Sequence, residues 1–186
     1  MANKVRFGLK NVYVASVTQA DGGAITFGTP EALPGAVKMS LEAAGDTTDF
    51  YADDQKYFTD TANNGYTGEL EIAELPQSFV VNYLGATVDS NGNVIEQTTD
   101  KAKNFALLFE FNGDEKAVRH ILYYCKASRP KLESETTSES KEPKTTTLEF
   151  SAIAIPGTDI VKGYSGSESS NYDSWFNKAP VTPVFA

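Results

Sequence analysis

The sequence has very few of the residues that most enzymes use for chemistry. Among 186 residues it has one histidine, His120, and one cysteine, Cys125. A lone cysteine excludes an internal disulfide and a cysteine-based zinc cluster. A metal site would therefore need mostly carboxylate ligands, and the sequence has neither an Asp-x-Asp-x-Asp-Gly loop nor a glycine-rich phosphate loop. We expect no metal and no cofactor.

Long apolar runs and an excess of positive charge are also missing. No apolar run approaches the ~18 residues that span a bilayer, and the first residues lack the apolar stretch of a signal peptide. We therefore expect no membrane association, and a cytoplasmic rather than a secreted origin. The formal net charge is -9, from 25 acidic and 16 basic residues. This balance disfavours a protein that grips nucleic acid, because phosphate binding needs positive charge.

Apolar and polar residues alternate along much of the chain, which is typical of half-buried β-strands. The alternation is clearest in three segments: 5–17, 37–42 and 66–72. In the second segment, Val37, Met39 and Leu41 are expected to face the core. Two further segments are apolar at both parities and predict strands covered on both faces: 105–111 and 118–125. The fold class predicted is all-β.

Turn-forming residues lie between these segments. Asn112-Gly113-Asp114 separates the two most apolar segments and is the strongest hairpin signal. Asp21-Gly22-Gly23 predicts an N-terminal hairpin, and Asn91-Gly92 marks a further turn. These turns are short, so the strands that they join are expected to be antiparallel neighbours.

One short helix is predicted at about 76–84. Pro76 suits a first helical position, and Gly85 supplies the stop. Between them, four residues form one apolar stripe: Phe79, Val80, Tyr83 and Leu84. A helix with one apolar stripe is expected to lie against the sheet.

The chain is expected to form one β-domain at 1–155 and a C-terminal arm at 156–186. Long loops are predicted at about 45–65 and 133–144, and the second is rich in Ser, Thr and Glu and cannot bury a core. The arm holds Gly, Ser and Pro, yet it keeps five aromatic residues. We therefore expect the arm to dock on this chain or on a neighbouring one.

The candidate catalytic groups have simpler structural explanations. His120 shares a parity with apolar neighbours, and Cys125 has the opposite parity, so the two side chains would not meet within a strand. Glu69 and Glu71 share one face about 7 Å apart, a spacing that resembles a glycosidase pair. However, they lie on the polar side of an amphipathic strand, and no pocket residues accompany them. We expect no catalytic residues.

The segment DFYADDQKYF, residues 49–58, puts four aromatic residues and three aspartates into a stretch with neither strand nor helix periodicity. Burying the aspartates would be costly, whereas exposed clustered rings mark interaction sites. The segment is therefore interpreted as an interface between subunits or rings. The alternative is that the rings fold back over their own sheet. The predicted contact residues are Asp49, Phe50, Tyr51, Asp53, Asp54 and Tyr57.

Four stretches, in this order, resemble the major tail tube proteins of long, non-contractile-tailed phages and related prophages of Gram-positive bacteria. They are MANKVRFGLKNVYVA (1–15), DFYADDQKYF (49–58), NGYTGELEIAELPQSF (64–79), and YDSWF with the closing APVTPVF (172–176 and 179–185). The resemblance spans most of the chain and is weakest at 89–103 and 133–144. The type VI secretion tube protein shares this family's fold.

The resemblance implies a β-sandwich or half-barrel with one flanking helix, whose subunits join edge to edge into hexameric rings. Rings stack into a hollow tube through which DNA passes without specific binding. The implied partners are further copies of the chain, the tape-measure protein, the tail terminator and the distal tail initiator. The implied location is the virion tail tube, with assembly in the host cytoplasm. No enzymatic role is implied.

An acidic tube wall would repel phosphate, so that DNA slides through. The expected lumen-facing residues are Glu42, Glu69 and Glu71, although Lys38 on the same face has the wrong sign. The arm contacts are expected to come from Tyr172, Trp175 and Phe176.

The alternative function is a monomeric β-sandwich binding module for carbohydrate or a cell surface. In that case Tyr164, Tyr172 and Trp175 would form an aromatic platform for sugar stacking. The two functions differ in one observable, because a tube protein assembles and a binding module stays monomeric.

Overall fold

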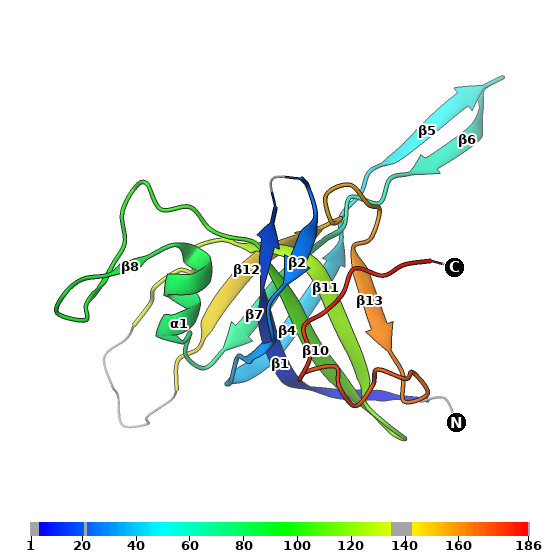
Figure 1. The fold of residues 1–186 in the computed structure, drawn as a ribbon. Helices are drawn as coiled ribbons and strands as arrows, with labels where there is room; N and C mark the ends of the chain where they lie inside the picture. The colour runs from blue at the N-terminus through cyan, green and yellow to red at the C-terminus, as the bar shows by residue number, and fades with distance from the viewer. Residues whose placement is uncertain (1–3, 21, 135–142, 186) are drawn as a thin grey trace.

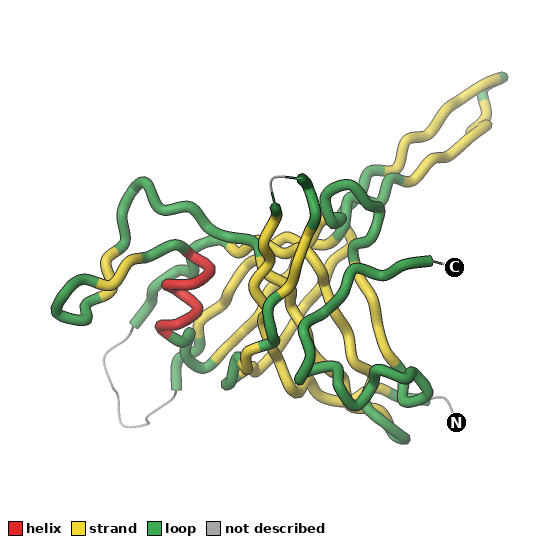
Figure 2. Tube along the Cα trace, viewed as in Figure 1, coloured by secondary structure: helices red, strands yellow, loops and turns green. Residues whose placement is uncertain are grey.

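The computed structural model describes residues 4–20, 22–134 and 143–185. Within these ranges the chain is mostly β-structure with one short helix (Figures 1 and 2). The strands are β1 (Arg6–Gln19), β2 (Ile25–Phe27), β3 (Glu31–Ala32), β4 (Ala36–Ala43), β5 (Thr47–Ala52), β6 (Gln55–Thr61), β7 (Tyr66–Ile72), β8 (Thr87–Val88), β9 (Val94–Ile95), β10 (Phe105–Gly113), β11 (Val118–Ala127), β12 (Thr146–Ile153) and β13 (Lys162–Ser165). The all-β prediction is confirmed.

Nine strands form one antiparallel sheet that curls without closing into a barrel (Figure 1). Its order is β2-β1-β10-β11-β12-β7-β4. Strand β13 pairs with β11 beside β12, and β3 pairs with β1 beside β2. Because β2 and β4 end the order, the sheet is an open half-barrel.

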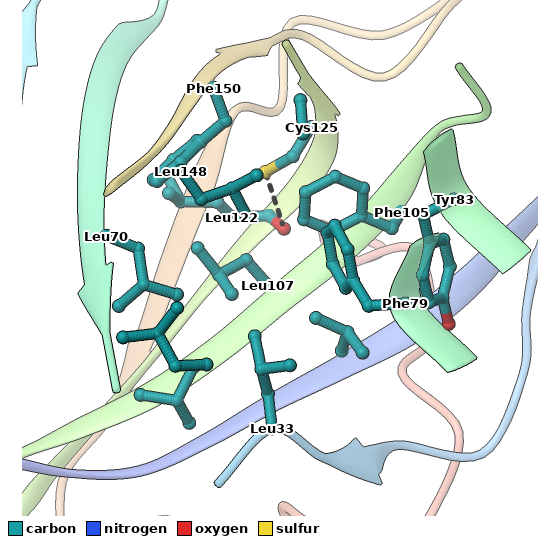
Figure 3. Packing of buried hydrophobic residues seen from close by; sticks show 14 of the residues in the cluster. Leu33, Leu70, Phe79, Tyr83, Phe105, Leu107, Leu122, Cys125, Leu148 and Phe150 are labelled. Carbon is teal, nitrogen blue, oxygen red and sulfur yellow. Dashed lines mark hydrogen bonds between the residues drawn. The ribbon is translucent and has the colours of Figure 1, made fainter. Parts of the chain in front are cut away.

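The middle of this sheet separates two apolar cores. In β10, Phe105, Leu107 and Phe109 pack into the main core, while Ala106 and Leu108 pack into a second core on the opposite face. This confirms that the strand is covered on both faces, as its continuous apolar sequence predicts. Figure 3 shows part of the main core, where side chains of β7, β10, β11 and β12 pack together with those of the helix.

The helix covers one end of the main core. It consists of α1 (Gln77–Phe79) continued by the wider turn η1 (Val80–Leu84). Pro76 is its N-cap rather than its first helical residue, and Gly85 ends it with φ 93°, as the sequence predicts. Phe79 and Tyr83 pack on Phe105, with ring centroids 5.5 and 5.4 Å away (Figure 3). Burial, with a contribution from Glu31, raises the pKa of Tyr83 to about 12.

The segment at 45–65 is not a loop, so this prediction is wrong. Strands β5 and β6 pair as a hairpin whose two-residue turn is Asp53-Asp54. Both turn residues have positive φ, 50° and 57°, the backbone of a type I′ turn, which matches the twist of the strands that it joins. These strands could not be predicted because neither of their faces is buried. Apolar and polar residues alternate along a strand only when one face is buried and the other is exposed.

The prediction that Val37 faces the core is also wrong. The β4–β7 register shifts between Ala36 and Lys38, and Val37 occupies this irregularity with 55% of its surface exposed. A bulge reverses the inward and outward parity on one side of it. Met39 and Leu41, beyond the bulge, do pack against the main core.

The predicted turns are present. Strands β10 and β11 form the expected hairpin, and β1 pairs with β2 around Gly22 and Gly23, although Asp21 lies outside the described residues. Gly92, with φ 87°, turns the small β8–β9 hairpin. The predicted loop at 133–144 lies mostly outside the described residues, which stop at 134 and resume at 143.

Gly68 leads to a test of the packing. It lies in β7 opposite Phe150 of β12, and a Cβ at this position would come within 2.4 Å of the Phe150 ring. We expect Gly68→Ala to lower the free energy of unfolding by about 1–3 kcal/mol, as overpacking does. Strand propensity alone would predict a gain.

The matched control is Gly8→Ala in β1, where a Cβ would meet nothing within 4 Å. Urea unfolding of both variants beside the wild type measures the difference. A Gly68→Ala protein as stable as the Gly8→Ala protein would contradict the packing of Phe150 over Gly68.

Candidate functional site

Strands β12, β7 and β4 bury one face in the main core and present the other to solvent. On the solvent face, cross-strand pairing produces three rows of three polar residues. The rows are Thr147–Glu71–Lys38, Glu149–Glu69–Ser40 and Ser151–Thr67–Glu42. We call this surface the acidic face, because it carries four carboxylates and one lysine.

All three residues predicted for a lumen, Glu42, Glu69 and Glu71, lie on the acidic face, as does Lys38. Sequence analysis did not single out Glu149, which lies directly opposite Glu69. The alternation of polar and apolar residues at 146–153 places Glu149 on the polar side of its strand. It identifies Glu149 as a neighbour of Glu69 only once the pairing of β12 with β7 is known. Thr145 donates a hydrogen bond of 2.7 Å to the Glu71 carboxylate.

The opposition of Glu69 and Glu149 works against stability. Directly opposed residues on antiparallel strands have Cβ atoms about 4.5–5.5 Å apart, and like charges at this distance are destabilising. A protein selected for stability alone would place an opposite charge or a threonine here. The pair therefore concentrates negative charge at the centre of the acidic face.

The β5–β6 hairpin projects away from the rest of the molecule (Figure 1). Phe50, Tyr51, Tyr57 and Phe58 are each 59–75% exposed, so the rings do not fold back over the sheet of their own chain. The predicted residues Asp49, Asp53 and Asp54 lie on the same hairpin and are exposed.

Few interactions hold this hairpin in place beyond its own ladder. Asp49 pairs with Lys56 at 2.8 Å and accepts a hydrogen bond of 3.0 Å from Thr59. Phe50 lies opposite Phe58 across the ladder. An isolated two-stranded hairpin is at best marginally stable in water. Its exposed rings therefore form a surface suited to a partner.

The C-terminal arm docks on its own chain. Phe176 and Trp175 join the second core, and Phe176 stacks on Tyr13 with ring centroids 4.7 Å apart. The Arg119 guanidinium lies 3.9 Å from the centre of the Tyr172 ring, and the Tyr172 hydroxyl donates to the Ala117 carbonyl at 2.9 Å. The three predicted arm residues thus lie together, on the sheet of the same chain.

A buried polar cluster lies beneath this arm. Glu110 is almost fully buried and accepts hydrogen bonds from Asn11 at 2.7 Å and from Arg119 at 3.2 Å. Arg119 also donates to the Tyr172 carbonyl. A buried charge is tolerated only when it is paired and hydrogen-bonded. Arg119 therefore neutralises the Glu110 carboxylate and at the same time holds the arm through Tyr172.

Two strand edges are open. Within the described residues, no strand pairs with the outer edge of β4, or with β1 between Arg6 and Asn11 on the side away from β10. Unpaired edges can accept a strand from another chain.

The structure offers no arrangement for catalysis at the residues considered from sequence. His120 stacks on Phe109 with ring centroids 5.2 Å apart. Cys125 is fully buried, its thiol lies 3.7 Å from the Leu122 carbonyl (Figure 3), and burial raises its pKa well above the ordinary value. Among the described residues no cluster of three or more His, Cys, Asp or Glu could hold a metal ion. No helix in the described part of the chain is long and apolar enough to span a membrane.

The three residues considered for a sugar platform are not equivalent. Tyr164 is 72% exposed, whereas Tyr172 and Trp175 are partly covered by contacts to their own chain. The indole of Trp175 joins the second core, and its N–H faces the His120 carbonyl at 3.4 Å. The arrangement does not form an open aromatic platform.

Comparison with known protein families gives a match over most of the chain. A family model described as phage tail tube protein matches residues 2–165. A comparison with curated proteins found no significant match.

The opposed carboxylates give a direct test. We expect Glu69→Gln to raise the free energy of unfolding by about 0.2–1 kcal/mol at low salt, because it removes a cross-strand repulsion. The gain should shrink at high ionic strength, which screens exposed charges.

Urea unfolding of Glu69→Gln, Glu149→Gln and the double variant measures the coupling between the two sites. Purely additive effects, or no gain at low salt, would show that the two carboxylates do not repel one another.

Proposed function

This chain belongs to the phage tail tube protein family, and from that premise we propose that its copies join into hexameric rings that stack into the tail tube. As a member of this family the protein is a structural virion component and not an enzyme. The tube would be the conduit through which DNA leaves the capsid.

The observation that carries self-assembly is the β5–β6 hairpin. Four exposed rings on a hairpin with no core of its own need a surface to cover them. The hairpin residues proposed for contacts between subunits or rings are Asp49, Phe50, Tyr51, Asp53, Asp54 and Tyr57. In this proposal the rings supply the apolar contact area, and the aspartates fix register through charge.

The open edges of the sheet support a ring. Among the described residues, the outer edge of β4 and the start of β1 on its side away from β10 have no strand partner. Pairing β4 of one subunit with β1 of the next would continue the sheet around the ring and remove both edges. Each interface would then join two different surfaces, and such head-to-tail interfaces form a ring when the rotation between neighbours closes.

The acidic face is the proposed lumen surface, with Glu42, Glu69 and Glu71 joined by Glu149. Carboxylates that line a channel repel phosphate, so that DNA moves without being held. This gives the opposition of Glu69 and Glu149 a function that would offset its cost to stability.

The further proposed partners are the tape-measure protein inside the tube, the tail terminator at one end and the distal tail initiator at the other. Assembly would take place in the cytoplasm of the bacterial host. The alternative of a monomeric carbohydrate-binding module is weakened, because Tyr172 and Trp175 contact their own chain instead of forming a platform.

Removing the exposed rings tests the interface. We expect Phe50→Ala/Tyr51→Ala to abolish rings and tubes in negative-stain electron microscopy while the melting temperature stays close to that of the wild type. The reason is that both side chains are exposed in the single chain, so they stabilise only the assembly.

The control for this variant is Val94→Ala/Ile95→Ala, which truncates two exposed apolar residues on the β8–β9 hairpin. This variant should assemble normally. Normal tubes from Phe50→Ala/Tyr51→Ala would rule out the proposed interface.

A charge reversal tests the lumen. Tubes of Glu69→Lys/Glu149→Lys should retain DNA that is protected from nuclease, and the retention should fall steeply with salt, as phosphate binding does. The control Glu74→Lys/Asp159→Lys makes the same change in net charge at exposed residues outside the acidic face. Equal nuclease protection in both variants, or none in either, would count against the acidic face as the lumen.

A further inference from the structure

A hollow of about 900 Å³ lies at the tip of the β10–β11 hairpin, bounded by β13 and by the chain just before β1. Its wall includes Lys4 and Val5 before β1, Phe111 of β10, Val118 of β11, and Lys162 and Tyr164 of β13. We call it the tip hollow. Val5 and Tyr164 in its wall are more than half exposed, so apolar surface at this hollow faces solvent.

We propose that the tip hollow receives the β5–β6 hairpin of a second copy of this chain. The inference rests on the proposed self-assembly and names the surface that covers the hairpin. It adds a specific receptor, because the family match contains no information about which residues of one copy meet the hairpin of another.

The hairpin cannot fill the tip hollow of its own chain. In Figure 1 the hairpin points to the upper corner of the molecule, while the start of β1 and the tip of the β10–β11 hairpin, which flank the hollow, lie at the lower edge. A contact between two such separate surfaces joins copies head to tail. Head-to-tail contacts repeat from copy to copy and produce rings or filaments rather than closed dimers.

The two surfaces match in apolar character. The hairpin presents four exposed rings, and the hollow presents Val5, Phe111, Val118 and Tyr164. Aromatic residues that enter a partly apolar pocket are the common anchors of protein interfaces.

The two surfaces are also opposite in charge. The hairpin at 47–61 carries four aspartates and one lysine. The hollow carries three lysines, Lys4, Lys116 and Lys162, and two glutamates, Glu115 and Glu168. The hollow thus has a small net positive charge and the hairpin a net negative one, which favours their association over that of two surfaces of like charge.

The other segment that could cover the hollow is the end of the arm, where Val181, Val184 and Phe185 are exposed. It carries two prolines and no acidic side chain between 179 and 185. The lysines of the hollow therefore favour the hairpin, and the experiment below separates the two occupants.

The test uses two single-cysteine variants mixed before assembly. Gln55→Cys places a thiol on the exposed start of β6, and Ser167→Cys makes a nearly isosteric change in the wall of the hollow. The native Cys125 is buried and does not compete. Under mild oxidation we expect about tenfold more cross-linked dimer from this mixture than from a control mixture, because docking raises the effective concentration of the two thiols.

The control mixture pairs Gln55→Cys with Ser128→Cys, an exposed serine just beyond the other end of β11. The excess cross-link should disappear when Phe50→Ala/Tyr51→Ala is added to the Gln55→Cys chain. A second variant, Asp53→Asn/Asp54→Asn, removes two charges while keeping residues that tolerate the positive φ of the turn. It should weaken the cross-link and reduce its dependence on salt.

Each outcome separates the inference from the proposed function. Tubes with no excess cross-link over the control would overturn the tip hollow as the receptor and leave self-assembly standing. A cross-link from Ser167→Cys to Val184→Cys in place of Gln55→Cys would assign the hollow to the arm and overturn the inference. A wild-type chain that never assembles would overturn both.

Discussion

The unequal coverage of one curled sheet is the constraint on which the rest of the structure depends. Strand β10 is buried on both faces, between the main core and the second core. Strands β12 and β7 are buried on one face only, and their other face is the acidic face. As a result, the C-terminal arm covers the second core, and the acidic face stays exposed to solvent.

The arm and the β5–β6 hairpin differ in how they place their aromatic rings. The arm buries its rings on its own chain, where Arg119 pairs with the buried Glu110 and lies over Tyr172. The hairpin exposes its rings, and within the chain it has little more than its own ladder and the Asp49–Lys56 pair. The arm is therefore stabilised within the monomer, whereas the rings of the hairpin remain exposed there. In our proposal the same distinction separates folding from assembly.

Much of the fold follows from the sequence, because burial on one face imposes alternation and burial on both faces imposes continuous apolar runs. The strands at 66–72 and 105–111 and the stop at Gly85 are clear for this reason. Three features could not be predicted. The β5–β6 hairpin has no buried face, so no period is imposed on it. The bulge at Val37 reverses parity in a single step. The opposition of Glu69 and Glu149 depends on the register of strands about eighty residues apart, which no local pattern contains.

Cryo-electron microscopy of the wild-type chain, incubated at rising concentration with and without isolated tail tips as seeds, tests the central claim most directly. The account predicts tubes of stacked rings, with the acidic face on the channel wall and the β5–β6 hairpin covered by a neighbouring copy. A chain that stays monomeric with seeds present would contradict the account, as would tubes in which the hairpin remains exposed to solvent.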